Sequence, residues 1–193
     1  MGVEFELKYS ADPGQQEKIR ELYFREHQRW EMATVYYDTP SRSLSARHIT
    51  LRCRQENSTS VCTVKTPISG YGRGEWDCEC DDIVKAIPVL CEKGAPAILM
   101  ALTEEGVQEV CGARFTRLAA DVTLGDTRLE IALDRGILTG GGREEPLCEV
   151  EVELKSGDPD HAVAFGLKLK KDFGLISQEK SKFRRALALA KGE

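Results

Sequence analysis

Two distant segments of this chain alternate charged and apolar residues in the same way. Near the N-terminus, Glu4, Glu6 and Lys8 alternate with apolar residues, and residues 149–155 repeat the pattern with three glutamates and a lysine. Successive side chains of a β-strand point to opposite faces, so each segment predicts a strand with one charged face and one apolar face. Two such strands can line a charged interior and cover their apolar faces with helices. That layout suits a site for a multiply charged anion and its metal ions.

The size and charge of the chain limit its fold and its partners. With 193 residues the chain can bury one substantial core, so we expect a single domain over residues 1–193. The net charge of −5 provides no general attraction to nucleic acid, and no nucleic acid partner is expected. No apolar run is long enough to cross a bilayer, and the N-terminus lacks the pattern of a signal peptide. We therefore expect a cytoplasmic protein without membrane contact.

The cysteines and histidines form no recognisable metal or catalytic motif. The seven cysteines are an odd number, and Cys78 and Cys80 have no second pair that would complete a zinc site. His27, His48 and His161 are scattered along the chain. We therefore expect reduced, mostly buried thiols, with neither a histidine-based metal site nor a Ser-His-Asp triad.

Residue patterns along the chain predict an antiparallel sheet with helices outside it. Asp12-Pro13 is typical of a helix cap followed by proline at the first helical position, and Gly125-Asp126 is typical of a tight hairpin. The predicted helices cover residues 13–30, two or three short segments within 81–110, a segment ending near 172, and 178–191. The predicted strands cover residues 2–9, 32–38, 47–55, 60–66, 72–80, 113–124, 126–134, 136–139 and 146–155. About eight strands, mostly joined by hairpins, favour an antiparallel barrel.

Several other predicted strands also carry charged residues on one face. Arg52 and Arg54 share a face of one strand, and Glu130 and Asp134 share a face of another. Any single strand of this kind could simply turn its charges to water, as antiparallel sheets commonly do. Across the set this interpretation weakens, because like charges on one face repel unless cations lie among them. Mg²⁺ and Mn²⁺ choose carboxylate oxygens, whereas arginine and lysine suit phosphate oxygens, so the set indicates a site for a metal-bound polyphosphate.

The run Glu4-Phe5-Glu6-Leu7-Lys8 matches the Glu-x-Glu-x-Lys signature of the CYTH family, also called triphosphate tunnel metalloenzymes. Further blocks resemble the family's later motifs in the same order. These blocks are residues 36–40, Leu44, 51–54, 63–65, 73–77, 129–136, 149–157 and 181–184. The resemblance covers nearly the whole chain. It implies an α+β fold, in which an eight-stranded antiparallel closed β-barrel forms a tunnel with a charged interior and helices packed outside.

The resemblance also implies an activity. Members of the family include inorganic triphosphatases, thiamine triphosphatases, class IV adenylyl cyclases and RNA triphosphatases, which act on a triphosphate with Mg²⁺ or Mn²⁺. The motif spacing looks most like that of bacterial inorganic triphosphatases, so hydrolysis of inorganic triphosphate is the expected reaction. The alternatives are a class IV adenylyl cyclase, a thiamine triphosphatase, a non-catalytic polyphosphate- or nucleotide-binding module, and a barrel whose charges only solubilise it. Related proteins pair, so a homodimer is also expected.

Carried over by position, the resemblance implies two groups of site residues. The implied metal ligands are Glu4, Glu6, Glu75, Glu130, Glu149, Glu151 and Glu153. The implied phosphate-binding catalytic residues are Lys8, Arg52, Arg54, Lys65, Arg73, Arg117 and Lys182. The residue pattern leaves open whether Arg114 or Arg117 points inward. The chain departs from the family pattern at Arg185, where glycine is frequent, and at Asp77, where glutamate is common.

Overall fold

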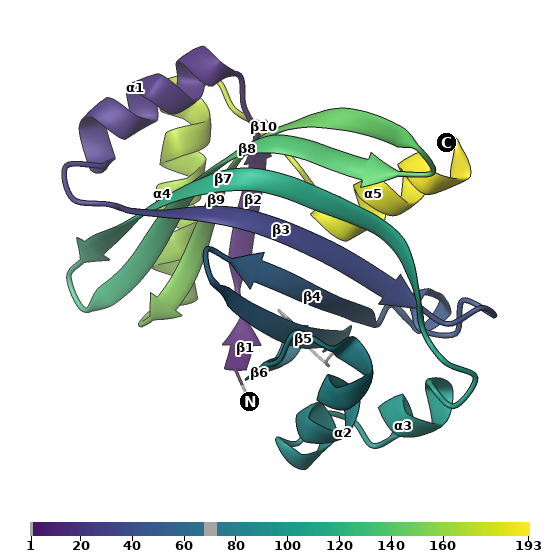
Figure 1. Ribbon diagram of the computed structural model, residues 1–193. Helices are drawn as coiled ribbons and strands as arrows, with labels where there is room; N and C mark the ends of the chain where they lie inside the picture. Colours follow the sequence, from purple (N-terminus) through teal and green to yellow (C-terminus); the bar gives the residue numbers. More distant parts are fainter. Residues whose placement is uncertain (1, 68–72) are drawn as a thin grey trace.

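The computed structural model describes residues 2–67 and 73–193, and for residues 2–4 it describes the backbone only (Figure 1). Its described strands form one antiparallel sheet in the order β1-β6-β5-β4-β3-β7-β8-β9-β2-β10. The strands are β1 (Gly2–Glu4), β2 (Glu6–Ser10), β3 (Gln28–Asp38), β4 (Thr50–Glu56), β5 (Thr59–Pro67), β6 (Arg73–Glu79), β7 (Gln108–Leu124), β8 (Thr127–Gly140), β9 (Arg143–Ser156) and β10 (Ile176–Ser177).

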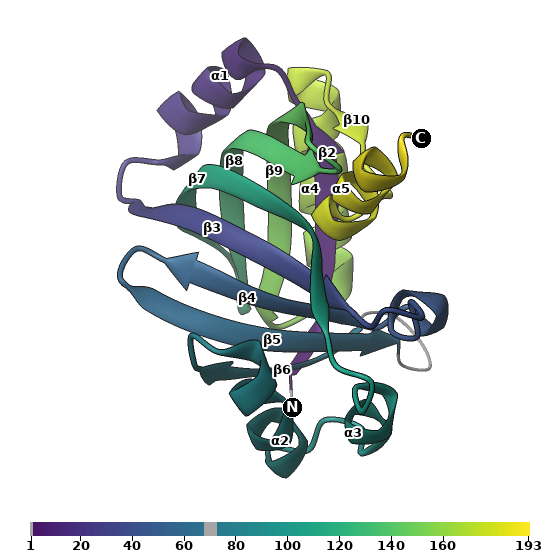
Figure 2. The ribbon, with the colours of Figure 1, turned by 45° about the vertical axis from the view of Figure 1, so that its right-hand side comes forward.

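The N-terminal segment joins the two ends of this sheet. Its first part, β1, pairs with β6, and its second part, β2, pairs with β9. The two parts are separated only by Phe5, whose carbonyl accepts a hydrogen bond from the backbone N–H of Leu154 at 2.9 Å. The sheet is therefore closed through the covalent chain at Phe5 and not by a continuous ladder, and its strands curve into a barrel-like arrangement (Figures 1 and 2). This confirms the expected α+β fold with an antiparallel barrel.

Two groups of helices cover the outer face of the sheet. Helices α1 (Pro13–Tyr23) and α4 (Pro159–Phe173) pack on β2, β8 and β9, where Phe165 and Leu169 meet Val150 and Val152. Helices α2 (Ile83–Glu92) and α3 (Ile98–Leu102) pack on β4, β5 and β6 in a second core. The apolar faces of the alternating strands therefore point outward, under helices. Among the described residues, no helix combines the length and the apolar character needed to cross a bilayer.

Helix α5 (Lys182–Lys191) lies against the opposite face of the sheet. Its Ala186 belongs to a third apolar cluster with Phe115 and Leu147. By strand alternation, those two residues share a face with Arg117 on β7 and Glu149 on β9. The first turn of α5 thus enters the charged interior, and its next turn packs on apolar residues at one end of the interior.

The main error of the sequence prediction concerns residues 24–30. The predicted helix over 13–30 begins correctly, because Asp12 and Gln15 form a capping box, but it ends at Tyr23. Strand β3 begins at Gln28 and pairs with β7 from that residue onward, so long-range pairing overrides the local helical pattern. The predicted strands 126–134 and 136–139 are also one strand, β8, which pairs with β7 and β9 without a break at Gly136.

Two leucines of α4 test how much the outer core stabilises the fold. Leu169 is 0% exposed, whereas Leu167 on the same helix is 58% exposed. Leu169→Ala should lower the free energy of unfolding by about 2–5 kcal/mol, because it removes buried methyl groups and leaves a cavity. Leu167→Ala should change it by less than about 0.5 kcal/mol. Urea unfolding followed by circular dichroism measures both values, and equal losses would contradict this packing.

Candidate functional site

A cavity of about 640 Å³ opens on the charged face of the sheet. All seven predicted phosphate-binding residues line it, from Lys8 on β2 to Lys182 on α5. Four of the predicted metal ligands also line it, namely Glu6, Glu75, Glu151 and Glu153. Glu130 and Glu149 lie beside these residues without lining the cavity, and the side chain of Glu4 lies outside the described residues. The sheet therefore brings together charged groups that are more than 170 positions apart in the chain.

Strand register sets which charged residues become neighbours. On β2 and β9, Glu6 lies opposite Glu153, and Lys8 lies opposite Glu151. On β8 and β9, Glu130 lies opposite the same Glu153. Glu6, Glu153 and Glu130 therefore form a row of three carboxylates across adjacent strands, which we call the acidic row. Like charges placed directly opposite each other destabilise a sheet, so this row favours a bound cation.

Two lysines accompany the acidic row. Lys8 donates to Glu6 at 2.7 Å, and the ammonium of Lys155 lies 3.3 Å from Glu130 and 2.8 Å from Glu153. Burial lowers the pKa of Lys8, but Glu6 and Glu151 outweigh it, and the pKa is raised overall. Lys8 therefore stays protonated and reduces the repulsion at one end of the row.

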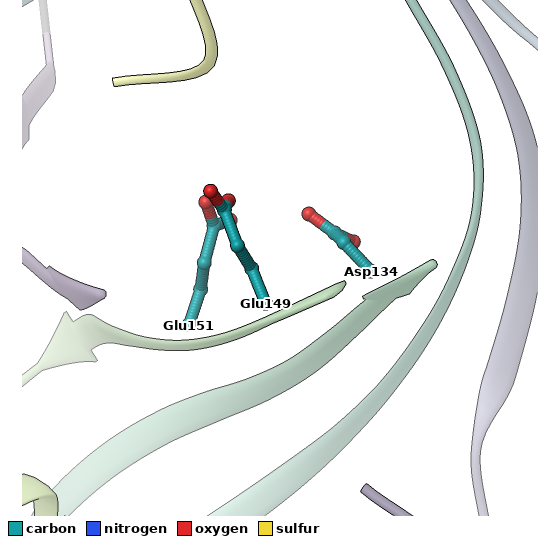
Figure 3. A group of neighbouring side chains, drawn as sticks. All are labelled: Asp134, Glu149 and Glu151. Carbon is teal, nitrogen blue, oxygen red and sulfur yellow. The ribbon is translucent and has the colours of Figure 1, made fainter. Parts of the chain in front are cut away.

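A second acidic group lies deeper, where Asp134, Glu149 and Glu151 project from β8 and β9 toward the same point (Figure 3). The ammonium of Lys182 lies between them, 2.8 Å from Asp134, 2.7 Å from Glu149 and 2.6 Å from Glu151. Arg117 forms a two-bond pair with Asp134, at 2.7 and 2.6 Å, and also contacts Glu151. Strand predictions from the sequence placed Asp134 on a charged face but did not include it among the site residues.

Burial and pairing have opposite effects on the pKa values of these acids. Burial would raise the pKa of Glu151, but Lys182 and Arg117 hold it well below its usual value. For Glu149, burial outweighs the attraction of Lys182, and the pKa is raised. One oxygen of Glu149 also accepts a hydrogen bond from Arg185. Arg185, a departure from the family pattern, is thus part of the buried network.

The structure also answers the question left open about the two arginines of β7. Arg117 lines the cavity, whereas Arg114 lies on the opposite face of the strand, is exposed, and pairs with Glu144 at 3.3 Å. The two residues are an odd number of positions apart, so an unbroken strand must send their side chains to opposite faces.

The opposite wall of the cavity is basic and is built by β4, β5 and β6. Burial, followed by the repulsion of Arg52, lowers the pKa of Arg54 to about 10. The Nε of Arg52 is buried and has no hydrogen-bond acceptor among the described residues. Glu75 lies on this wall, 3.6 Å from Arg52 and 3.4 Å from Lys65, so its carboxylate is shared by two cations. The wall, which we call the basic wall, therefore favours a bound anion.

Arg73 differs from the other cations of the basic wall because it donates to backbone carbonyl oxygens. Its Nη2 donates to the carbonyl oxygen of His48 at 2.7 Å and to that of Lys65 at 3.1 Å. These bonds tie β6 to β5 and to the segment before β4. The neighbouring Asp77 is exposed and does not line the cavity.

Aromatic residues near the cavity expose little ring surface. Tyr36 and Phe183 line it with ring centroids 5.1 Å apart, but they are only 3% and 7% exposed. Trp76 packs in the outer core under α2, and Trp30 packs beside the cluster that holds α5. Both tryptophans therefore serve in packing.

Comparisons with known proteins agree with the fold. The model of the CYTH domain matches residues 2–187. An inorganic triphosphatase of Haemophilus influenzae is 28% identical in an alignment of 189 residues that covers 93% of this chain and 53% of that protein. The chain thus spans about half the length of this curated relative.

Two solved structures share the fold over almost their whole length. A Hippeastrum adenylyl cyclase candidate, described as having a dominant triphosphatase activity, has a TM-score of 0.69 at 19% identity, covering 99% of this chain and 97% of that one. The PH1819 protein of Pyrococcus horikoshii has a TM-score of 0.63 at 26% identity, covering 97% and 99%. These likenesses show the fold, and the domain match over nearly the whole sequence shows that the chain belongs to the CYTH domain family.

Proposed function

We propose that the cavity binds inorganic triphosphate with divalent metal ions and hydrolyses it, releasing phosphate. The observation that carries this proposal is the arrangement of charge: the basic wall of β4–β6 faces the acidic row of β2, β8 and β9 across one cavity. A simple anion needs only the basic wall. A metal-loaded polyphosphate needs both, because its oxygens attract cationic side chains and its metal ions attract carboxylates. The name of the Haemophilus relative supports the same reaction.

The residues of the basic wall would bind and neutralise the phosphate chain. Arg52 has an unsatisfied buried Nε–H, and a phosphate oxygen there would provide the missing acceptor. Arg54 and Lys65 complete the wall from β4 and β5. Phosphoryl transfer depends mainly on positioning and on stabilising charge that develops on the oxygens, which fixed cations achieve without rearrangement. Arg73 would act indirectly, because its bonds to backbone carbonyls hold the wall in place.

The acidic row fits a hard divalent cation such as Mg²⁺ or Mn²⁺. Its donor set consists of carboxylate oxygens, and its members lie directly opposite one another on paired strands. Glu6, Glu153 and Glu130 would hold the ion, and the position of Glu4 in the sequence makes it a further ligand to test. A bound ion would polarise phosphate oxygens or the attacking water. Lys8 would keep Glu6 oriented through its 2.7 Å hydrogen bond.

The cyclase and thiamine triphosphatase alternatives receive less support from the cavity. Both substrates carry an organic group that needs a stacking or apolar surface. Tyr36 and Phe183 are the described aromatic residues that line the cavity, and at 3% and 7% exposure they present almost no ring face. A binding module without catalysis would not require the acidic row. Hydrolysis of a triphosphate without an organic group is therefore the reaction that the cavity favours.

Carboxylate substitutions test the role of the acidic row. Glu6→Gln and Glu153→Gln should each lower turnover of triphosphate by roughly 10²- to 10⁴-fold, because each removes a charge that would hold the metal at the reacting phosphate. Phosphate release with Mg²⁺ or Mn²⁺ measures this, and parallel assays of ATP for cyclic AMP test the cyclase alternative. The matched control is Glu144→Gln. Glu144 lies on β9 like Glu153, but it is exposed and pairs with Arg114, so this variant should leave turnover unchanged. Normal turnover in both site variants would contradict the proposal.

We expect Arg54 to contribute to triphosphate binding and, at the same time, to lower the free energy of unfolding. Burial lowers its pKa to about 10, so its charged form is destabilised in the folded protein at neutral pH. Arg54→Met should therefore raise the free energy of unfolding by about 1 kcal/mol or more while abolishing triphosphate binding. Thermal unfolding and calorimetric titration measure the two effects.

The matched control for Arg54 is Arg114→Met, which removes an exposed arginine from an outward-facing position. It should change stability by less than about 0.5 kcal/mol and leave triphosphate binding intact. An Arg54→Met protein that still binds triphosphate would argue against a phosphate-binding role for Arg54, and a destabilised one would argue against the expected cost of burying its charge.

A further inference from the structure

The deep acidic group has the geometry of a metal site but already contains a cation. Oxygens of Asp134, Glu149 and Glu151 lie within 4.8 Å of one another, and we call these three residues the carboxylate cage. The ammonium of Lys182 lies inside the cage, 2.6–2.8 Å from one oxygen of each residue. The ammonium donates a hydrogen bond to Glu151 and forms ion pairs with Asp134 and Glu149. Lys182 therefore has the position that a metal ion would take among these ligands.

The charges of the cage are balanced without a metal ion. Arg117 neutralises Asp134 and Glu151 from β7, and Arg185 contacts the second oxygen of Glu149 from α5. With Lys182, three bases thus face three acids, and the cage carboxylates and Lys182 are at most 7% exposed. A divalent ion added to this group would leave two uncompensated positive charges in a buried site, which is strongly unfavourable.

We infer that Lys182 is the resident cation of the carboxylate cage, that it excludes a divalent ion from the cage, and that it thereby confines metal binding to the acidic row. The inference rests on the proposed function and deepens it, since it says which carboxylates take the metal. Glu149 and Glu151 then position Lys182 and the first turn of α5. Lys182 is a positioning residue that determines the number of metal sites, because its ammonium pairs with the cage carboxylates.

Arg185 gives this inference a second, independent support. It pairs with Glu149 and also, through Nε at 3.1 Å, with Glu145 on the same strand. Lys182 and Arg185 are three positions apart on α5, so both lie on one side of the helix. Two cations from one helical turn therefore pair with the same buried carboxylate, one at each oxygen, and compensate its charge without a metal ion.

Counting bound Mn²⁺ tests the inference without relying on activity. The full chain is titrated with Mn²⁺ in the absence of triphosphate, and free Mn²⁺ is measured by electron paramagnetic resonance. Lys182→Ala should bind one more Mn²⁺ per chain than the unmodified protein, because it opens the cage and leaves it one positive charge short. Adding Glu149→Gln to Lys182→Ala should abolish the extra site. An equal count for Lys182→Ala and the unmodified protein would overturn the inference.

Lys155→Ala is the matched control. Lys155 also bridges two carboxylates on β8 and β9, but these belong to the acidic row. Its removal should change the affinity for Mn²⁺ and leave the number of ions unchanged. An extra ion in this variant as well would show that any missing lysine creates a site, and the inference would fail.

Thermal unfolding covers the case in which Lys182→Ala is poorly folded without metal. Mn²⁺ should then raise its melting temperature by more than it raises that of the unmodified protein, because the ion replaces the missing ammonium. Failure of Mn²⁺ to stabilise the variant would overturn the inference. Failure of the proposed function has a different signature, namely an unmodified protein that binds no Mn²⁺ with triphosphate present and releases no phosphate.

Discussion

The structure depends on the compensation of charges that are buried on the inner face of the sheet. The clearest case is the ammonium of Lys182, which three carboxylates from β8 and β9 surround at 2.6–2.8 Å. A buried charge without partners would be very costly, so these groups must be placed together for the fold to be stable. This requirement fixes the register of β7, β8 and β9 and pins the first turn of α5 to them. The apolar contacts of Ala186 then stabilise α5 in the position that the ion pairs already specify.

The walls of the cavity differ because different pairs of strands supply them. The acidic row comes from β2, β8 and β9, while the basic wall comes from β4, β5 and β6. Between them lies the network of Lys182, Arg117 and the carboxylate cage, which is balanced within itself. On the basic wall, the buried Nε of Arg52 has no hydrogen-bond acceptor among the described residues. Charge of opposite sign on facing walls is what a metal-bound anion would complement, and this connects the fold to the proposed function.

Period-two alternation made the inner face of the sheet predictable from the sequence. It identified Glu6, Lys8 and Glu151 before any spatial information, because strand parity alone decides which face a residue occupies. It left Arg114 and Arg117 unresolved, since the choice requires knowing that β7 runs unbroken past both residues. The split of the N-terminal strand at Phe5 and the early end of α1 also depend on pairing with distant strands. Local patterns carry no information about those partners.

The partners of Lys182 also could not be predicted from local patterns, and they determine what this residue does. Its position in the sequence suggested a phosphate-binding lysine, and the residue does line the cavity. Its function follows from which atoms surround Nζ, and those belong to strands more than thirty positions earlier in the chain. An ammonium that already pairs with three carboxylates has little attraction left for phosphate oxygens. A lysine in a charged tunnel is therefore defined by its neighbours: among arginines it is an anion ligand, and inside a carboxylate cage it takes the place of a metal ion.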